Sequence, residues 1–240
     1  MMQGWRARIG QMRPATAIEG AEEWRSVAPV GVAFADARTI VRRVDNDGLK
    51  EMMSQVLEAS RQLATAKVDL IVQCGAPGTF LRGPGHDEQV AKEIENETGI
   101  KSITMMQGMM EGLKALDARK IAVATIYSDE VNKQMTSYME ALGFEIVAME
   151  GLQITDPFEA SLHDADSAYR LGREAFRKAG KADAILISCG TYRSFPIIPY
   201  LEMDTGVPVV SSNQATLWHA LRSLGLPDEI PDLGKLWRVA

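Results

Sequence analysis

Short apolar runs and longer periodic stretches alternate along this chain. The short runs are apolar at nearly every position, which predicts parallel strands that helices cover on both faces. These strands are predicted at 8–12, 30–34, 68–73, 101–104, 120–126, 144–149, 183–188 and 208–211. The periodic stretches predict helices near 47–65, 86–98, 106–117, 129–142, 158–180, 194–203 and 213–224. Alternating strands and helices indicate βαβ units, and therefore an α/β fold with parallel sheets.

Local signals mark some boundaries in this pattern. Asp129 is placed to cap the N-terminus of the helix that follows it, and Gly143 comes after the last apolar turn as a stop signal. The stretch 13–29 contains two prolines and no clean period. It is predicted to be a loop over the edge of a sheet, and it is a candidate lid.

One apolar run occurs twice. The sequence DLIVQCG at 69–75 returns as DAILISCG at 183–190, and its Cys74 and Cys189 are the only cysteines of the chain. Each run reads as a buried strand that opens with Asp and closes with Cys-Gly. Both thiols therefore fall just past the carboxyl end of a central strand, where open α/β sheets bind their ligands. The repeat predicts a site between two halves, with sulfur on both walls.

The repetition extends beyond the cysteines. Residues 97–100 match 204–207, and residues 107–116 match 214–224 with one insertion. A period of this length is too long for a solenoid and indicates a duplicated domain. The fold prediction is thus two duplicated Rossmann-like (flavodoxin-like) α/β domains with parallel sheets and the active site between them. The first domain is assigned residues 1–116 plus 213–240, and the second is assigned residues 117–212.

Charge and composition limit the kinds of molecule that this protein is expected to bind. A net charge of −6 disfavours nucleic acid, because phosphate binding needs clustered Lys and Arg. No apolar run approaches membrane-spanning length, and no signal peptide is visible at the start. We therefore expect a cytoplasmic protein that has no membrane partner and whose cysteines are free thiols. The sequence leaves open whether the chain forms a homo-oligomer.

Cys189 is the stronger candidate for chemistry. A free thiol has a pKa of about 8.5, and amide N–H groups at a helix N-terminus lower it. A helix predicted to start near Ser194 would aim such groups at Cys189, where they could also hold a carboxylate or an enolate oxygen. Gly190 allows the backbone to approach a ligand closely. For Cys74 the case is weaker, because residues 76–78 offer less for a helix start. The alternative for both is a small buried apolar side chain.

Other candidates surround this pair. Tyr127 ends a predicted strand and could donate a hydrogen bond to a carboxylate, or it could be a half-buried core residue. Arg13 could bind a carboxylate with two hydrogen bonds, or it could be a solvated surface residue. For Asn213 an N-cap role is the default explanation. The three histidines show no metal-site spacing, and neither a G-x-G-x-x-G nor a P-loop motif is present, so no metal or organic cofactor is expected.

These features resemble the aspartate/glutamate racemase superfamily, and within it the arylmalonate decarboxylase and maleate isomerase branch. The most specific segments are residues 9–14, 80–85, 122–132, 188–190 and 206–212. The resemblance implies a cofactor-independent enzyme that works on a carbon next to carboxylates. It also implies that Pro14, Gly75, Ala76, Tyr127 and Gly190 contact the substrate. In the racemases the two cysteines act as base and acid. In the decarboxylases the second cysteine protonates an enediolate, and in the isomerases the first cysteine attacks the double bond.

The departures from these patterns concern the first half. If the first motif is aligned with the family by its strand, Cys74 matches the first cysteine of racemases and isomerases. If the motif is aligned from Arg82 and Gly83, Gly75 takes that position, and the decarboxylases also carry glycine there. Ala76 and Pro77 stand where the decarboxylases carry a hydroxyl-bearing pair. The preferred hypothesis is decarboxylation of a small substituted malonate-type acid with Cys189 as proton donor. A two-cysteine isomerase or racemase is the alternative, and a non-enzymatic binding protein for a small mono- or dicarboxylate is a third hypothesis.

Overall fold

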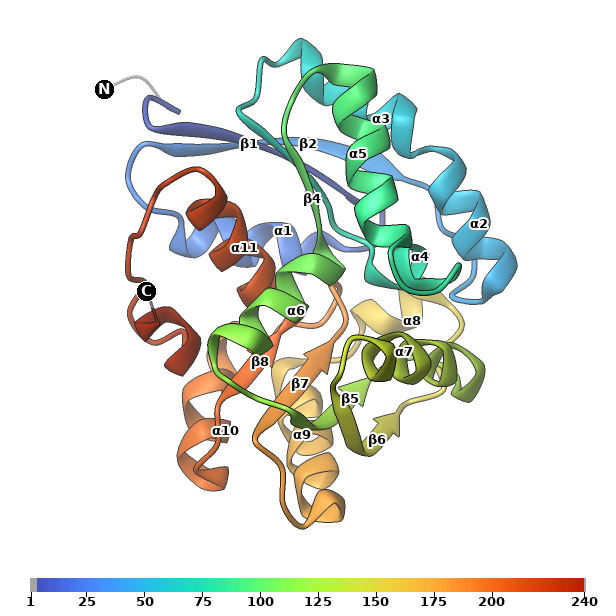
Figure 1. Cartoon of the computed structure of the whole chain (residues 1–240), viewed down its shortest axis with the longest axis vertical. Helices are drawn as coiled ribbons and strands as arrows, with labels where there is room; N and C mark the ends of the chain where they lie inside the picture. The colour runs from blue at the N-terminus through green and yellow to red at the C-terminus, as the bar shows by residue number, and fades with distance from the viewer. Residues whose placement is uncertain (1–3, 240) are drawn as a thin grey trace.

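Two parallel four-stranded sheets form the framework of the molecule. The computed structural model describes residues 4–239, with the first sheet in the upper half of Figure 1 and the second in the lower half. The first sheet has the order β2-β1-β3-β4 and the second has the order β6-β5-β7-β8. Their bounds are β1 Ala7–Pro14, β2 Val32–Thr39, β3 Leu70–Gln73, β4 Ser102–Thr104, β5 Lys120–Thr125, β6 Glu145–Gly151, β7 Ala184–Ser188 and β8 Val209–Ser211. All eight predicted strands are present. The strands of the two sheets follow the same order, which confirms the duplicated α/β fold.

The aspartate that precedes each central strand has the same structural role in both halves. Asp69 accepts a hydrogen bond of 2.7 Å from the amide N–H of Arg8, next to the start of β1. Asp183 accepts hydrogen bonds of 3.0 and 2.8 Å from the amides of Arg119 and Lys120, at the start of β5. In each half the aspartate thus ties the central strand to the first strand of its own sheet and fixes their register.

A second pair of repeated residues turns the chain into the fourth strand of each sheet. Gly99 and Gly206 end helices with φ of +69° and +76°, a left-handed conformation that glycine adopts without strain. One turn earlier, the Glu95 carboxylate accepts from the amide of Ser102 and the Glu202 carboxylate accepts from the amide of Val209, both at 2.9 Å. The same device therefore starts β4 and β8.

The helices cover the outer faces and the space between the sheets. Their bounds are α1 Ile18–Val27, α2 Asn46–Ser54, α3 Val56–Thr65, α4 Ala76–Phe80, α5 His86–Thr98, α6 Met105–Ala115, α7 Asp129–Ala141, α8 Pro157–Ser161, α9 Ala165–Ala179, α10 Ile198–Thr205 and α11 Ser212–Ser223. Short 3₁₀ turns occupy Phe195–Ile197 and Lys235–Arg238. Among residues 4–239, no helix combines the length and the apolar character needed to cross a membrane.

α6 and α11 join the two halves at the centre of the molecule (Figure 1). Each begins with a capping box, Thr104 with Gln107 in α6 and Ser211 with Gln214 in α11, which accounts for the repeated glutamines. A Cβ atom on Gly108 of α6 would lie 2.7 Å from the Cα of Thr216. The glycine therefore permits the two helix backbones to pack in direct contact.

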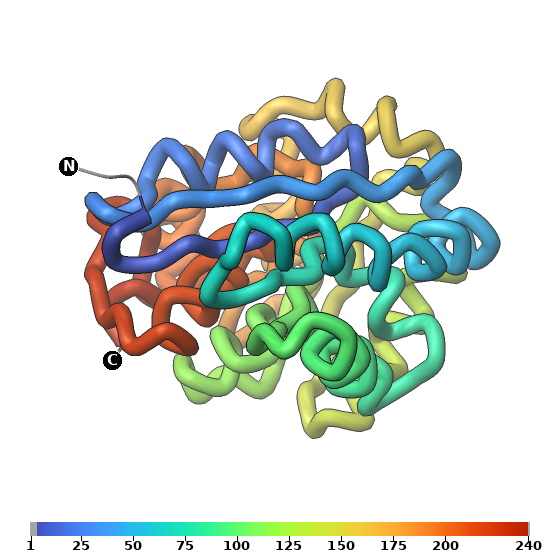
Figure 2. The backbone as a smooth tube through the Cα atoms, turned by 90° about the horizontal axis from the view of Figure 1, so that it is seen from above, coloured from blue at the N-terminus to red at the C-terminus, as the bar shows by residue number. Residues whose placement is uncertain are grey.

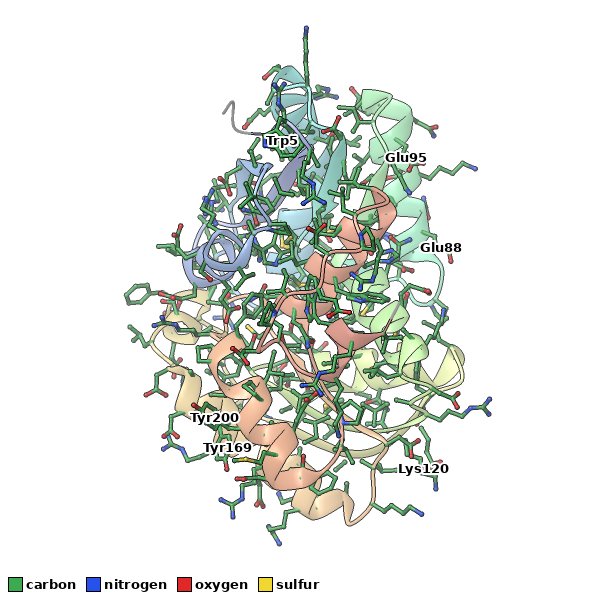
Figure 3. The ribbon with its side chains drawn as sticks, turned by 90° about the vertical axis from the view of Figure 1, so that its left-hand side faces the viewer. Trp5, Glu88, Glu95, Lys120, Tyr169 and Tyr200 are labelled. Carbon is green, nitrogen blue, oxygen red and sulfur yellow. The ribbon has the colours of Figure 1, made fainter. Side chains whose placement is uncertain are left out.

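We propose the domain division 1–116 plus 213–240 and 117–212 because α11 packs against α1 and α6 of the first half. Residues 1–3 and 240 lie outside the described residues. Seen from above in Figure 2, β1 and β2 run side by side over the first half. Figure 3 shows labelled side chains of both halves on the outside, with Glu88 and Glu95 on α5 of the first half and Tyr169 and Tyr200 on α9 and α10 of the second.

Several predicted helix boundaries are wrong. The stretch 47–65 is divided into α2 and α3 at Gln55, and the stretch 158–180 is divided into α8 and α9. Asp129 is the first residue of α7 and not its cap; the cap is Ser128, whose hydroxyl accepts from the amide of Val131. The stop at Gly143 is confirmed, since this residue has φ of +88° just beyond the end of α7.

The largest error concerns the stretch 13–29, which was predicted to be a loop. It contains the last residues of β1 and the whole of α1. The inner face of α1 consists of Gly20, Ala21, Glu23 and Trp24, all buried. A glycine, an alanine and a carboxylate give no apolar period, so the helix has no signature in the hydrophobic pattern. The short helix α4 was also missed.

Candidate active site

A cavity lies between the two sheets, at the carboxyl ends of β1, β3, β5 and β7. It contains about 510 Å³ of free space, part of it open to solvent. Both cysteines line it, Cys74 after β3 and Cys189 after β7. The other lining residues are Pro14, Thr16, Ala17, Val41, Val44, Leu49, Met52, Gly75, Ala76, Pro77, Met105, Ile126, Tyr127, Pro157, Ala160, Gly190 and Thr191. The cavity therefore lies at the carboxyl ends of the parallel strands, where α/β sheets bind their ligands.

The structure brings most of the predicted site residues to this cavity. Those that line it are Pro14, Cys74, Gly75, Ala76, Tyr127, Cys189 and Gly190. Arg13 is the exception, because it is fully buried and is not among the residues that line the cavity. Its guanidinium donates to Gln11 Oε1 at 2.6 Å and to Asn213 Oδ1 at 3.0 Å. The alternative of a solvated surface residue is therefore wrong, while the binding of a carboxylate by Arg13 stays a prediction.

Cys189 lines the cavity from a turn, with 5% of its surface exposed. Burial raises the pKa of its thiol, and the backbone N–H groups of Thr191 and Tyr192 act in the opposite direction. The amide of Thr191 lies 3.4 Å from the Cys189 Sγ. The predicted helix near Ser194 begins as a 3₁₀ turn, and the amides of Ser194 and Phe195 donate to Glu23 and not into the site. Turn amides therefore replace the helix N-terminus that was predicted.

Cys74 is more deeply buried, with 1% of its surface exposed. Its Sγ lies 3.7 Å from the carbonyl oxygen of Val72, on its own strand. Burial raises the pKa of this thiol, while the positive charge of Arg13 lowers it. Contrary to prediction, a helix does start after this cysteine, since Gly75 is the N-cap residue of α4.

Tyr127 lines the same cavity with its phenol, although only 3% of the residue is exposed. Burial raises its pKa, and the neighbouring Cys189 adds to the effect, so the phenol is a hydrogen-bond donor at neutral pH. Its backbone is fixed on both sides. The Tyr127 amide donates to Thr125 Oγ1 at 3.1 Å, and its carbonyl accepts from Asn132 Nδ2 at 3.2 Å.

Backbone amides add further donors around the two thiols. In the part of the chain that the structure describes, no hydrogen bond uses the amide N–H of Gly75, Ala76 or Gly190. All three residues line the cavity. Unpaired N–H groups of this kind can bind the oxygens of a carboxylate or of an enediolate.

Several apolar residues also line the cavity; we call them the apolar wall, and the sequence did not predict them. Val41, Val44 and Leu49 come from the first half, and Pro157 and Ala160 come from α8 in the second. Val41 and Val44 lie in a loop and Pro157 begins α8, so no periodic pattern marks these three residues. Leu49 and Ala160 lie within predicted helices. A hydrogen bond of 2.8 Å from the Val44 amide to the Thr155 carbonyl joins the two segments. No group of His, Cys, Asp or Glu within residues 4–239 is arranged to hold a metal ion.

A family model described as arylmalonate decarboxylase matches residues 12–237. The chain belongs to the arylmalonate decarboxylase family. Arylmalonate decarboxylase of Bordetella bronchiseptica is 30% identical over 182 residues, which are 76% of each chain. Maleate isomerase of Nocardia farcinica is 27% identical over 212 residues, covering 86% of this chain and 84% of the relative. A liganded variant of arylmalonate decarboxylase superposes with a TM-score of 0.90 at 27% identity, over 96% of this chain and 98% of that structure.

Membership of the arylmalonate decarboxylase family confirms the branch that the sequence resembles. It also confirms that the chain is an enzyme, of the lyase or isomerase type. These relatives lend no support to the hypothesis of a binding protein without activity. Because both decarboxylase and isomerase relatives match, the comparisons alone do not choose between the two reactions.

Proposed function

We propose that this enzyme decarboxylates a small substituted malonate-type acid and that Cys189 protonates the resulting enediolate. The observation that carries the proposal is that hydrogen-bond donors and apolar side chains line the same cavity. The donors are Cys189, the Tyr127 phenol and the unpaired amides of Gly75, Ala76 and Gly190. Such a site suits an acid that places one carboxylate on the donors and the other, with its substituent, against the apolar wall.

The proposed reaction needs no external electron acceptor. The bond between the α-carbon and one carboxylate breaks, carbon dioxide leaves, and the electron pair stays on the α-carbon and the remaining carboxylate as an enediolate. The Tyr127 hydroxyl and the amides donate to the enediolate oxygens, where negative charge develops. The proton of the Cys189 thiol then passes to the α-carbon, and water returns a proton to the thiolate.

The protonation state of Cys189 fits this role. An acid must carry its proton when the carbanion forms, and burial raises the pKa of Cys189, so the thiol is protonated at neutral pH. The apolar wall of Val41, Val44 and Leu49 would leave a carboxylate nearby poorly solvated. Loss of carbon dioxide spreads that charge over the enediolate, whose oxygens the Tyr127 hydroxyl and the backbone amides can bind.

A two-thiol isomerase or racemase is the second candidate, and the position of Cys74 favours it. Cys74 lines the same cavity as Cys189 but comes from the other sheet, as a second thiol acting on the opposite face of a substrate would. Arg13 favours its thiolate. The two-thiol reaction remains second because the Cys74 Sγ lies against the Val72 carbonyl of its own strand.

A substrate screen distinguishes the two candidates. Purified enzyme is incubated with substituted malonates, with maleate and with amino acids in heavy water. Carbon dioxide release and the NMR signal of the α-proton are followed together. We expect carbon dioxide from a malonate and one deuteron at the α-carbon of the product. Conversion of maleate, or α-proton exchange in an amino acid, without carbon dioxide release would favour the two-thiol reaction.

A further inference from the structure

Three buried polar side chains from distant parts of the sequence form one network behind the cavity. Arg13 of β1 is fully buried, and Glu23 of α1 is 6% exposed. Asn213 of α11 connects them: its Oδ1 accepts from Arg13 Nη1 at 3.0 Å, and its Nδ2 donates to Glu23 Oε2 at 2.8 Å. Burying a carboxylate or a guanidinium costs free energy unless the group is hydrogen-bonded. The hydrogen-bond partners of these residues therefore indicate what the network stabilises.

Those partners are the backbone groups of the segment 189–195, which we call the Cys189 loop. Asn213 Nδ2 lies 3.3 Å from the carbonyl oxygens of both Gly190 and Tyr192. The Glu23 carboxylate accepts from the amide of Ser194 and, at 2.7 Å, from the amide of Phe195. The network thus binds the loop from behind at four backbone positions.

The packing of α1 is specialised for this contact. A Cβ atom on Gly20 would lie 2.2 Å from the carbonyl oxygen of Gly190 and 2.6 Å from Arg13 Nη1. No side chain fits there, so only glycine lets the helix reach the loop. Trp24 completes the arrangement, because its ring lies 4.5 Å from the Arg13 guanidinium carbon and its indole donates to the Asn213 carbonyl at 2.8 Å.

We propose that Glu23 and Asn213, held by Arg13, are positioning residues that keep the Cys189 loop, and with it the thiol, in the reactive arrangement. The inference rests on the proposed function, in which Cys189 is the proton donor. None of the three residues lines the cavity, so they act through the loop and not on the substrate.

The network also makes the loop sensitive to pH. Burial raises the pKa of Glu23 to about 7, while the amides of Phe195 and Ser194, the Asn213 side chain and the Arg13 charge oppose the shift. The other charged groups around it are Glu19, Glu22 and Arg25 on α1 and Arg193 on the Cys189 loop. When the Glu23 carboxyl is protonated, its O–H faces N–H groups that also donate, so these hydrogen bonds are weakened. The loop is therefore held most firmly above about pH 7.

The test measures Cys189 directly and does not require a substrate. Iodoacetamide alkylates the wild-type enzyme and its variants over a range of pH, and peptide mass spectrometry quantifies the label on Cys189. Glu23→Gln keeps the shape but removes the charge, and Asn213→Asp removes the amide donor. Glu202→Gln is the matched control, because Glu202 is a buried carboxylate that accepts from the amides of Val209 and Lys235, away from the loop.

Both network variants should move the midpoint of the Cys189 alkylation profile to higher pH, by about half a unit or more, because the Thr191 and Tyr192 amides no longer face the sulfur. The wild-type profile should also show an inflection near pH 7, which Glu23→Gln loses and Glu202→Gln keeps. On the identified substrate, kcat should fall about ten- to a hundredfold with KM within about threefold, as expected for a misplaced acid.

A wild-type alkylation profile in folded Glu23→Gln would overturn the proposal, whatever the substrate. If Glu23→Gln does not fold, Glu23→Asp takes its place: a retained carboxylate should preserve the inflection near pH 7, and its loss would count against the proposal. A shifted profile in the network variants, together with no decarboxylation of any tested acid, would support the network and reject the proposed reaction.

Discussion

Gly20 of α1 lies against Gly190 of the Cys189 loop so closely that a Cβ atom on Gly20 would meet the Gly190 carbonyl oxygen at 2.2 Å. The backbone of α1 therefore sets the position of the loop. Gly20→Ala must push the two apart, and the expected result is a ten- to hundredfold fall in kcat, roughly what a displacement of about 1 Å costs. Steady-state kinetics on the identified substrate measures it.

The control for Gly20→Ala is another helical glycine. A Cβ atom on Gly112 of α6 would meet only side chains, those of Ala215 and Leu236 at 3.2 Å. Gly112→Ala should change stability modestly, by overpacking, and leave kcat within about threefold. Equal kcat values for Gly20→Ala and wild type would show that α1 does not position the loop.

Tyr127→Phe tests the role of the Tyr127 hydroxyl in the cavity. The ring and its packing are kept, so the variant should fold, while one hydrogen bond to a charged oxygen is lost. Such a bond contributes about 1.5–3 kcal/mol, which corresponds to roughly a ten- to 150-fold lower kcat/KM. Tyr138→Phe is the control, because Tyr138 is buried against Phe80 and does not line the cavity. Unchanged kinetics in folded Tyr127→Phe would reduce Tyr127 to a packing residue.

Glu23 should also make the free energy of unfolding depend on pH. Its pKa is about 7 in the folded protein against 4.5 for the free side chain, so the folded state binds more protons between these values. Its contribution is fully present below about pH 4.5 and is lost as the pH rises through 7, by roughly 3 kcal/mol in all. Ionised Glu23 thus positions the loop at the expense of stability.

Urea denaturation of wild type and Glu23→Gln at about pH 5 and pH 8 measures this contribution. The free energy of unfolding of wild type should fall more between the two pH values than that of the variant. The variant serves as the reference because all other titrating groups are common to both proteins. Identical pH dependence in the two proteins would mean that Glu23 does not retain a raised pKa.

The framework could be predicted from the sequence because each part of it is a local pattern that the two halves share. Asp69 and Asp183 begin the central strands by binding backbone amides of the neighbouring strand. Cys74 and Cys189 follow the apolar runs directly, so strand topology alone brings both to one cavity.

The network and the apolar wall could not be predicted in this way. Glu23 and Asn213 are 190 positions apart in the sequence and meet only because α1 and α11 pack together. Glu23 lies in the stretch 13–29, which was predicted to be a loop, and Asn213 was predicted to be a helix cap, although the cap of α11 is Ser211. Val44 lies in a loop and Pro157 begins the short helix α8, and neither belongs to a periodic pattern from which its place in the cavity could be predicted.

The most direct test of the central claim compares two single variants. Initial rates of carbon dioxide release from the preferred malonate are measured for wild type, Cys74→Ala and Cys189→Ala, with folding checked by circular dichroism. Departure of carbon dioxide creates the carbanion, so only one thiol is needed to protonate it.

The account predicts that Cys74→Ala keeps at least about a tenth of the wild-type rate, while Cys189→Ala loses about a hundred- to ten-thousandfold, the usual contribution of a general acid. Equal and near-complete loss in both variants would contradict it and favour the two-thiol isomerase or racemase, and a Cys189→Ala enzyme that retained half of its activity would remove Cys189 from the mechanism.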